Sequence, residues 1–314
     1  MRLIHADTFE MKEFIGSGTP PYAILSHTWG DDEVSFHAMQ STWDKAAQAP
    51  SELATQEVWD NAMKTKGFMK IVNSCKQARL DGIEWVWVDT CCIDKTSSAE
   101  LSEAINSMWA WYRDAWVCYA FLEDVPPLAP LLAPEEFASA RWFTRGWCLQ
   151  ELIAPSKLEF YASDWTEMGT KSSLKQQLEG ITGIPADALV GRKALSDYNV
   201  AQRMSWAAGR KTTRLEDEAY CLLGIFDINM PLLYGEGTHA FSRLQEQILM
   251  KTGDYSILLW TIPRLWEKDN GTSTGLFGVF ARSPMQSPAR QKILSPGSRP
   301  RPAPIPTSGP PSPV

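Results

Sequence analysis

The sequence predicts an α/β protein with a doubly wound parallel sheet, followed by a smaller, mainly helical extension. Short apolar runs rich in β-forming residues alternate with segments whose apolar residues repeat every three or four positions. This alternation is typical of parallel strands that are joined by right-handed crossovers, with helices on both faces of the sheet. With 314 residues, the chain is also long enough to bury a sizeable core.

Four runs are typical of buried strands. They are YAILSHTWG (22–30), IEWVWVDT (83–90), VCYAFLEDV (117–125) and LEFYAS (158–163). The apolar spacing between these runs predicts helices over residues 62–80, from Ser97 to 116, and from about Gly146. The second helix begins with Ser97 and Glu100 at capping-box spacing.

This pattern ends near residue 180, so we assign residues 1–180 to the α/β domain and 181–283 to the helical extension. In the extension, Thr213 and Glu216 have capping-box spacing, and Gly224 is expected to end their helix. A further helix carries Phe241, Leu244 and Ile248, and late strands are expected near SILLWTI and LFGVF. Ten prolines among small and polar residues predict a disordered tail over 284–314.

Composition excludes several classes of function. Thirty basic and 37 acidic residues give a net charge of −7, and no basic stripe is present, so nucleic acid is not an expected partner. The N-terminus lacks the apolar segment of a signal peptide, and no run approaches the roughly 18 apolar residues of a membrane span. We therefore expect a cytoplasmic protein with reduced cysteines. Its four histidines stand apart and no C-x-x-C occurs, so no metal site is expected.

Candidate ligand contacts follow the predicted strands, because open α/β sheets bind ligands beyond the carboxyl ends of their strands. They are Ser26, His27, Thr28, Trp29, Gly30 and Asp89, with Glu123 and Asp124 near the third strand. This set is polar, aromatic and anionic, and neither G-x-G-x-x-G nor a Walker lysine is present. Each residue also has a structural alternative, such as a hydrogen-bonded loop histidine for His27 or a strand-end cap for Asp89.

Three ordered stretches resemble the fungal heterokaryon-incompatibility (HET) domain over about residues 20–165. They are YAILSHTWG, WVWVDTCCID and RWFTRGWCLQELIAP. The later LEDEAYCLLGIFDINMPLLYGEGTHAFSRLQEQI resembles the segment that commonly follows this domain, whereas Asp94-Lys95 stands where many members carry Asn-Gln. The resemblance implies an intracellular effector of non-self recognition that triggers growth arrest and programmed cell death.

HET domains are also similar to TIR domains, which have a flavodoxin-like sheet and in several cases cleave NAD. WCLQEL, at 147–152, is similar to the W-C-x-x-E-L motif of plant TIR domains, whose glutamate is catalytic. This likeness implies that Glu151 is the catalytic carboxylate. It also implies that Ser26 to Gly30 and Asp89 contact NAD as a substrate, not as a tightly bound cofactor, with Trp29 stacking on a ring.

The chemistry fits that role, because cleaving nicotinamide from ribose develops oxocarbenium character that a single carboxylate can stabilise. In the structural alternative, Glu151 points to solvent or pairs with Arg141 or Arg145. Whether Glu151 faces the same cleft as the loop after the first strand discriminates between the two interpretations.

Two further functions are open. A non-catalytic signalling module would act by homotypic assembly, with the tryptophan-rich surface supplying contacts. A cysteine hydrolase would use Cys148 or Cys91 with His27, although no base is evident beside either thiol in the sequence. Self-association through the HET domain and an activating protein are the expected partners.

Overall fold

The computed structural model describes residues 1–127, 134–259, 281, 283 and 284. Within these residues, seven strands form one sheet in the order β2-β1-β4-β3-β5-β6-β7. The strands are β1 (Arg2–His5), β2 (Met11–Glu13), β3 (Ala23–His27), β4 (Trp85–Trp87), β5 (Val117–Phe121), β6 (Leu158–Tyr161) and β7 (Glu167–Thr170).

The helices are α1 (Phe36–Ala47), α2 (Glu52–Ala62), α3 (Lys66–Leu80), α4 (Ser98–Asp114), α5 (Pro134–Ala138), α6 (Cys148–Ile153), α7 (Lys175–Thr182), α8 (Ala186–Leu189), α9 (Val200–Ser205), α10 (Asp217–Tyr220), α11 (Leu223–Phe226) and α12 (His239–Thr252). Short 3-10 turns are η1 (Gly16–Gly18), η2 (Arg141–Thr144), η3 (Leu195–Asp197) and η4 (Tyr255–Leu258).

The four parallel strands confirm the doubly wound fold. β4, β3, β5 and β6 pair in parallel, and their order along the sheet is second, first, third and fourth in the chain. This is the order of flavodoxin-like sheets. All five residues of β3 and of β5 are buried, which explains why both strands are continuous apolar runs in the sequence.

The sheet also has three short antiparallel strands that the sequence pattern did not predict: β1, which lies between β2 and β4, and the two edge strands β2 and β7. Each has only three or four residues, too few for a clear alternation of apolar and polar positions. β1 is nevertheless part of the core, since Leu3 and Ile4 are fully buried where it pairs with β4.

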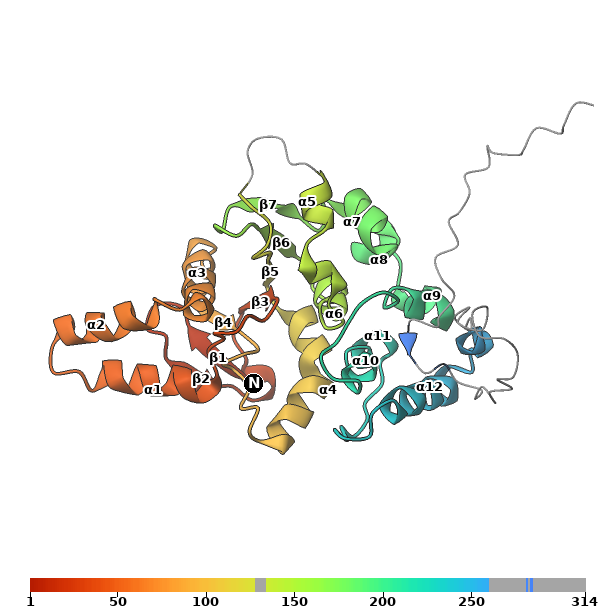
Figure 1. The fold of residues 1–314 in the computed structure, drawn as a ribbon, viewed down its shortest axis with the longest axis horizontal. Coiled ribbons are helices and arrows are strands. Elements are labelled where there is room, and N and C mark those ends of the chain that lie inside the picture. Colours follow the sequence, from red (N-terminus) through yellow and green to blue (C-terminus); the bar gives the residue numbers. More distant parts are fainter. Residues whose placement is uncertain (128–133, 260–280, 282, 285–314) are drawn as a thin grey trace, which may run out of the picture.

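Helices lie on both sides of the sheet, as Figure 1 shows for α3 on one side and for α4 and α6 on the other. α3 begins after Thr65, whose hydroxyl accepts a hydrogen bond from Phe68 N. α4 begins after Ser97, which caps Glu100 N as expected. The reciprocal half of the capping box is absent, because the Glu100 carboxylate accepts from Asp94 N at 2.7 Å and pairs with Arg2.

The extension packs against α4 (Figure 1). The helix expected after Thr213 is two short ones, since α10 ends at Tyr220 and α11 begins at Leu223. Glu216 does not close a capping box with Thr213; its carboxylate accepts from the amides of Gly235 and Gly237.

Gly224 does not end a helix but lies within α11, against α4. A Cβ at this position would lie 2.2 Å from Cβ of Trp109, so the absence of a side chain permits the close approach of the two helices. α12 buries Phe241, Leu244 and Ile248 on one face, as the spacing predicts.

The strand expected at SILLWTI is wrong for its described part, because Tyr255–Leu258 forms the turn η4. Asp254 accepts a hydrogen bond from Ser256 N there and favours a turn over an extended strand. Residues 260–262, the LFGVF run and residues 285–314 of the proline-rich tail lie outside the described residues. In the described part of the chain, no helix is both long and apolar enough to cross a bilayer.

Candidate functional site

A cavity of about 290 Å³ opens beyond the carboxyl ends of β3 and β4. The connections that follow the neighbouring strands β3 and β5 lead to opposite sides of the sheet, so the topological switch point lies between these two strands, next to the cavity. The cavity is lined by His27, Trp29, Asp89, Ile93, Lys95, Leu101, Ile105, Met108, Arg145, Trp147, Cys148, Glu151, Thr213, Arg214, Asp217 and Tyr234. Of the expected ligand contacts, His27, Trp29, Asp89 and Glu151 therefore share one cavity.

Glu151 lies on α6, a helix whose six residues are all buried between α4 and β3. The glutamate is only 7% exposed, and it makes no ion pair with Arg141 or Arg145. The solvent-facing and ion-paired alternatives are thus not what the structure shows. Its carboxylate instead accepts a hydrogen bond of 2.5 Å from the hydroxyl of Ser26.

Ser26 is held in place by a second hydrogen bond. Trp142 Nε1 donates to Ser26 Oγ at 2.7 Å, so the serine hydroxyl is left to donate its own hydrogen to Glu151. Both Ser26 and Trp142 are fully buried. Ser26, within β3, is not part of the cavity lining. Its hydroxyl orients the carboxylate of Glu151, which does line the cavity.

Burial is the main reason that the pKa of Glu151 rises to about 7, and the charge of Asp89 adds to the rise. Hydrogen bonds from Ser26 and from the Cys148 thiol, and the proximity of His27, oppose it. A carboxylate with this pKa changes its charge near neutral pH. Strongly shifted carboxyl groups in clefts are typical of functional sites.

His27 has one satisfied and one unsatisfied ring nitrogen. Its side chain is only 1% exposed, and Nε2 lies 3.3 Å from Glu33 Oε2. Nδ1 lies 3.9 Å from Asp89 Oδ1 and is buried with no hydrogen-bond partner among the described residues. A buried polar atom without a partner, on a side chain that lines a cavity, is suited to bind a ligand or water there.

Trp29 and Asp89 are joined directly, since Trp29 Nε1 donates to Asp89 Oδ2 at 2.9 Å. The tryptophan is 44% exposed, and Lys95 Nζ lies 3.5 Å from the centre of its ring. Trp29 is thus a fixed aromatic surface at the cavity, with a lysine on one face.

Thr28 and Gly30 face a different cluster and do not line the cavity. Thr28 O and Glu33 both accept hydrogen bonds from the buried Lys70, and Gly30 N donates to Glu33 at 2.8 Å. Although burial alone would raise the pKa of Glu33, hydrogen bonds from His27, Lys70 and Gly30 lower it to about 2. This ionised cluster fixes the loop that carries Trp29.

Glu123 and Asp124 also lie on this side. Glu123 Oε2 is 3.3 Å from Lys70 Nζ, and Asp124 accepts a hydrogen bond from Arg141 N. Both residues hold neighbouring loops together and are absent from the cavity lining.

One wall of the cavity comes from the extension, where no site residue was expected from the sequence. Asp217 on α10 accepts hydrogen bonds from Tyr234 at 3.0 Å and from Trp147. The Arg214 guanidinium lies 4.5 Å from the centre of the Tyr234 ring. No short motif marks these residues, because they approach the cavity only through the packing of the extension on α4 and α6.

The cysteines do not offer a nucleophile. Burial raises the pKa of the Cys148 thiol well above its usual range, and the neighbouring Glu151 adds to the rise. The pKa of Cys91 is also raised well above its usual range, mainly by a hydrogen bond with Cys92 and secondly by burial. Protonated, buried thiols are poor nucleophiles, so the cysteine-hydrolase interpretation is not favoured. In the described ranges, no three His, Cys, Asp or Glu side chains are grouped to hold a metal.

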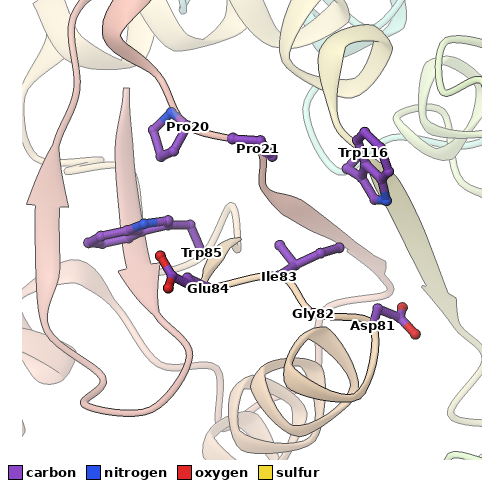
Figure 2. A pocket seen from close by; sticks show the side chains of 8 residues that line it. All are labelled: Pro20, Pro21, Asp81, Gly82, Ile83, Glu84, Trp85 and Trp116. Atoms are coloured by element: carbon purple, nitrogen blue, oxygen red, sulfur yellow. The ribbon is translucent and has the colours of Figure 1, made fainter.

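A second cavity, of about 350 Å³, lies at the other end of the parallel strands. Figure 2 shows Trp85 and Trp116 on the two sides of Pro20 and Pro21. These residues precede or begin strands β3, β4 and β5, so they lie at the amino ends of the parallel strands. Open α/β sheets bind ligands beyond the carboxyl ends of their strands, and the candidate active site is therefore the cavity of Glu151.

Fold and cavity together define a flavodoxin-like α/β protein with a site beyond the carboxyl ends of its parallel strands. A family model described as heterokaryon incompatibility protein (HET) matches residues 22–133. The vegetative incompatibility protein HET-E-1 of Podospora anserina is 43% identical over 275 residues, which cover 84% of this chain and 19% of that relative. The chain belongs to the HET-domain family. It spans about a fifth of the length of that relative, and no solved structure matches it significantly.

Proposed function

We propose that this protein is an intracellular effector of vegetative incompatibility that hydrolyses NAD, with Glu151 as the catalytic carboxylate. The similarity to HET-E-1, whose name states a role in vegetative incompatibility, supports the biological part. The position of Glu151 supports the chemical part. It is a buried carboxylate with a pKa of about 7, aligned by Ser26, in the same cavity as Trp29 and Asp89.

In the proposed reaction, the bond between nicotinamide and ribose breaks, and its electron pair leaves with nicotinamide. The leaving group departs neutral, and positive charge develops on the ribosyl ring. Ionised Glu151 stabilises this charge, because it acts in a site of low dielectric where a fixed carboxylate is effective. Water then adds to the ribosyl carbon and releases a proton, which gives ADP-ribose. No separate general acid is needed, since nicotinamide requires no proton to leave.

The surrounding residues fit substrate binding. Trp29 offers an aromatic surface for a ring, and Asp89, fixed by Trp29, accepts hydrogen bonds. Nδ1 of His27 has an unused hydrogen-bonding position beside Asp89. We assign these three side chains to the binding of the nucleoside that carries nicotinamide.

The test is to incubate the purified protein at high concentration with NAD and to measure nicotinamide release. Glu151→Gln should abolish release while the fold is retained, because the amide can still accept from Ser26. Glu159→Gln is the matched control. Glu159 is also buried, at 8% exposure, but lies on β6 with Tyr161 as its hydrogen-bond donor, away from the cavity. Release that is undiminished in folded Glu151→Gln would refute the catalytic role.

Homotypic assembly is a second proposal, and the second cavity, at the amino ends of the parallel strands, favours it. Trp116 is 63% exposed there, beside Pro21. Exposed tryptophans in apolar grooves are frequent anchors of protein contacts. Light scattering should then show self-association of the wild-type protein and its loss in Trp116→Ser. A monomer at every concentration would contradict this proposal without affecting the catalytic one.

A further inference from the structure

Two arginines, Arg145 and Arg214, line the cavity of Glu151 without a direct ion pair to any described residue. Arg145 is half-buried and Arg214 is exposed, and neither makes an ion pair with a residue that the structure describes. Arg214 is close enough to Glu216 and Asp217 to favour their ionised forms, but it makes no direct ion pair with either. The chain as a whole carries a net charge of −7, so two guanidinium groups at one cavity are not a consequence of a basic surface. A half-buried guanidinium without a partner is costly, and a bound anion would offset that cost.

Backbone pairing brings these arginines, 69 positions apart in sequence, to the same cavity. Lys211 N donates to Thr144 O at 2.7 Å, and Gly146 N donates to Lys211 O at 2.8 Å. Arg145 and Lys211 thereby form an isolated parallel bridge. The segment that leads to Arg214 is fixed along the segment that holds Arg145.

The Arg214 side chain is also oriented before any ligand binds. Its guanidinium lies over the ring of Tyr234, and Tyr234 is anchored by its hydrogen bond to Asp217. A guanidinium that stacks on an aromatic face keeps its N–H edges available for hydrogen bonds in the ring plane. Planar, two-pronged donors of this kind match the oxygens of a phosphate.

The third cation of the cavity is placed differently. Lys95 Nζ lies over Trp29, close to Asp89, at the end that we assign to the nucleoside. The two arginines and the Asp89 region thus come from different structural elements that meet in one cavity.

We propose that Arg145 and Arg214 form a diphosphate subsite, completed by the extension, that binds the pyrophosphate of a dinucleotide whose ribose lies at Glu151. The inference rests on the proposed function for the identity of the dinucleotide. The subsite makes the extension part of the binding site, with Arg214 as a determinant of specificity for phosphorylated over neutral nucleosides.

The test uses the full chain and isothermal titration with ADP-ribose, which carries the diphosphate but has no bond to be cleaved. Adenosine, which has no phosphate, is the neutral probe. Arg145→Gln and Arg214→Gln should each weaken ADP-ribose binding by about tenfold or more, and Arg214→Lys should weaken it less. Added salt should weaken ADP-ribose binding in the wild type far more than adenosine binding.

Arg192→Gln is the matched control, because Arg192 is an exposed arginine of the same extension that lies 3.8 Å from Asp187 and outside the cavity. It should bind ADP-ribose like the wild type. Unchanged ADP-ribose affinity in both cavity variants, or no ADP-ribose binding by the wild type, would overturn the subsite.

The two proposals fail in different ways. ADP-ribose binding that depends on the arginines, without nicotinamide release from NAD, would contradict only the hydrolase. Nicotinamide release together with ADP-ribose binding that ignores both arginines would contradict only the subsite.

Discussion

Ser26 and Glu151 are 125 positions apart in the sequence, and their side chains meet through a hydrogen bond of 2.5 Å. The contact joins the carboxyl end of β3 to the buried helix α6. Because Trp142 donates to the same serine oxygen, the direction of the Ser26 hydroxyl is fixed. Ser26 is thus a positioning residue for the carboxylate that faces the cavity.

The activity should depend on pH through Glu151. Its pKa of about 7 means that the carboxylate is mostly protonated at pH 6 and mostly ionised at pH 8. Only the ionised form stabilises a developing cation. NAD cleavage, measured as kcat/KM between pH 5.5 and 9, should therefore rise through a midpoint near 7 and reach a plateau. A profile that falls over this range would contradict the role of the carboxylate.

The stability of the fold should respond to the same group in the opposite direction. The pKa of Glu151 is raised from 4.5 to about 7, so between these values the folded protein holds a proton that the unfolded chain has released. The contribution of Glu151 to the free energy of unfolding is fully present below pH 4.5 and is lost as pH rises through 7. Glu151→Gln should remove this dependence and raise the free energy of unfolding at pH 8 by up to about 3 kcal/mol. Urea denaturation of the wild type and of Glu151→Gln at pH 5 and pH 8 measures the two free energies of unfolding. A difference between the two proteins that is the same at both pH values would count against this prediction.

Replacing Ser26 with alanine should shift the pH profile. The serine hydrogen bond lowers the pKa of Glu151, so its loss should raise the activity midpoint by about one pH unit. Trp142 would also lose its acceptor, whereas Ser26→Thr keeps a hydroxyl and should stay closer to the wild type. If Ser26→Ala lowers the rate without moving the midpoint, the serine acts on packing and not on the carboxylate.

Gly146 should tolerate no side chain. A Cβ there would lie 2.5 Å from Cγ2 of Thr212 and 3.2 Å from Sγ of Cys221, both in the extension. Gly146→Ala should lower the free energy of unfolding by about 1–3 kcal/mol. Gly180→Ala is the control, because Gly180 lies in α7 with nothing within 4 Å, and alanine should stabilise that helix by about 0.5–1 kcal/mol. Chemical denaturation of the two variants gives the comparison, and equal stabilities would be the contrary result.

The sequence predicts the centre of this fold because its parallel strands are buried on both faces. β3 and β5 appear as unbroken apolar runs, and Ser97 marks the start of α4. The antiparallel strands β1, β2 and β7 have only three or four residues each, too few to leave a periodic signal. The helix expected around Gly224 is divided between Tyr220 and Leu223, and Gly224 itself lies against Trp109, a tertiary contact that no local pattern contains.

The candidate site is predictable only on the side of the sheet. The rule for strand ends leads to His27, Trp29 and Asp89, which the structure brings together. It also leads to Thr28 and Gly30, which follow the same strand but turn toward Lys70 and Glu33, because a loop presents successive residues to different sides. Arg214 and Tyr234 lie in polar, turn-rich segments whose place beside the cavity is set by the docking of the extension.

Gly224 packs directly on Trp109 with no room for a side chain, so the α/β domain and the extension share a close interface. We expect a segment transferred to another protein to need both parts. A segment cut at residue 180 would carry Glu151 but leave the face of α4 without its cover and the cavity without one wall. α10, which carries Asp217 of that wall, packs in turn on α12. The similarity to HET-E-1 extends over 275 residues, far beyond the 22–133 of the family model, and it therefore includes residues of the extension as well as the sheet.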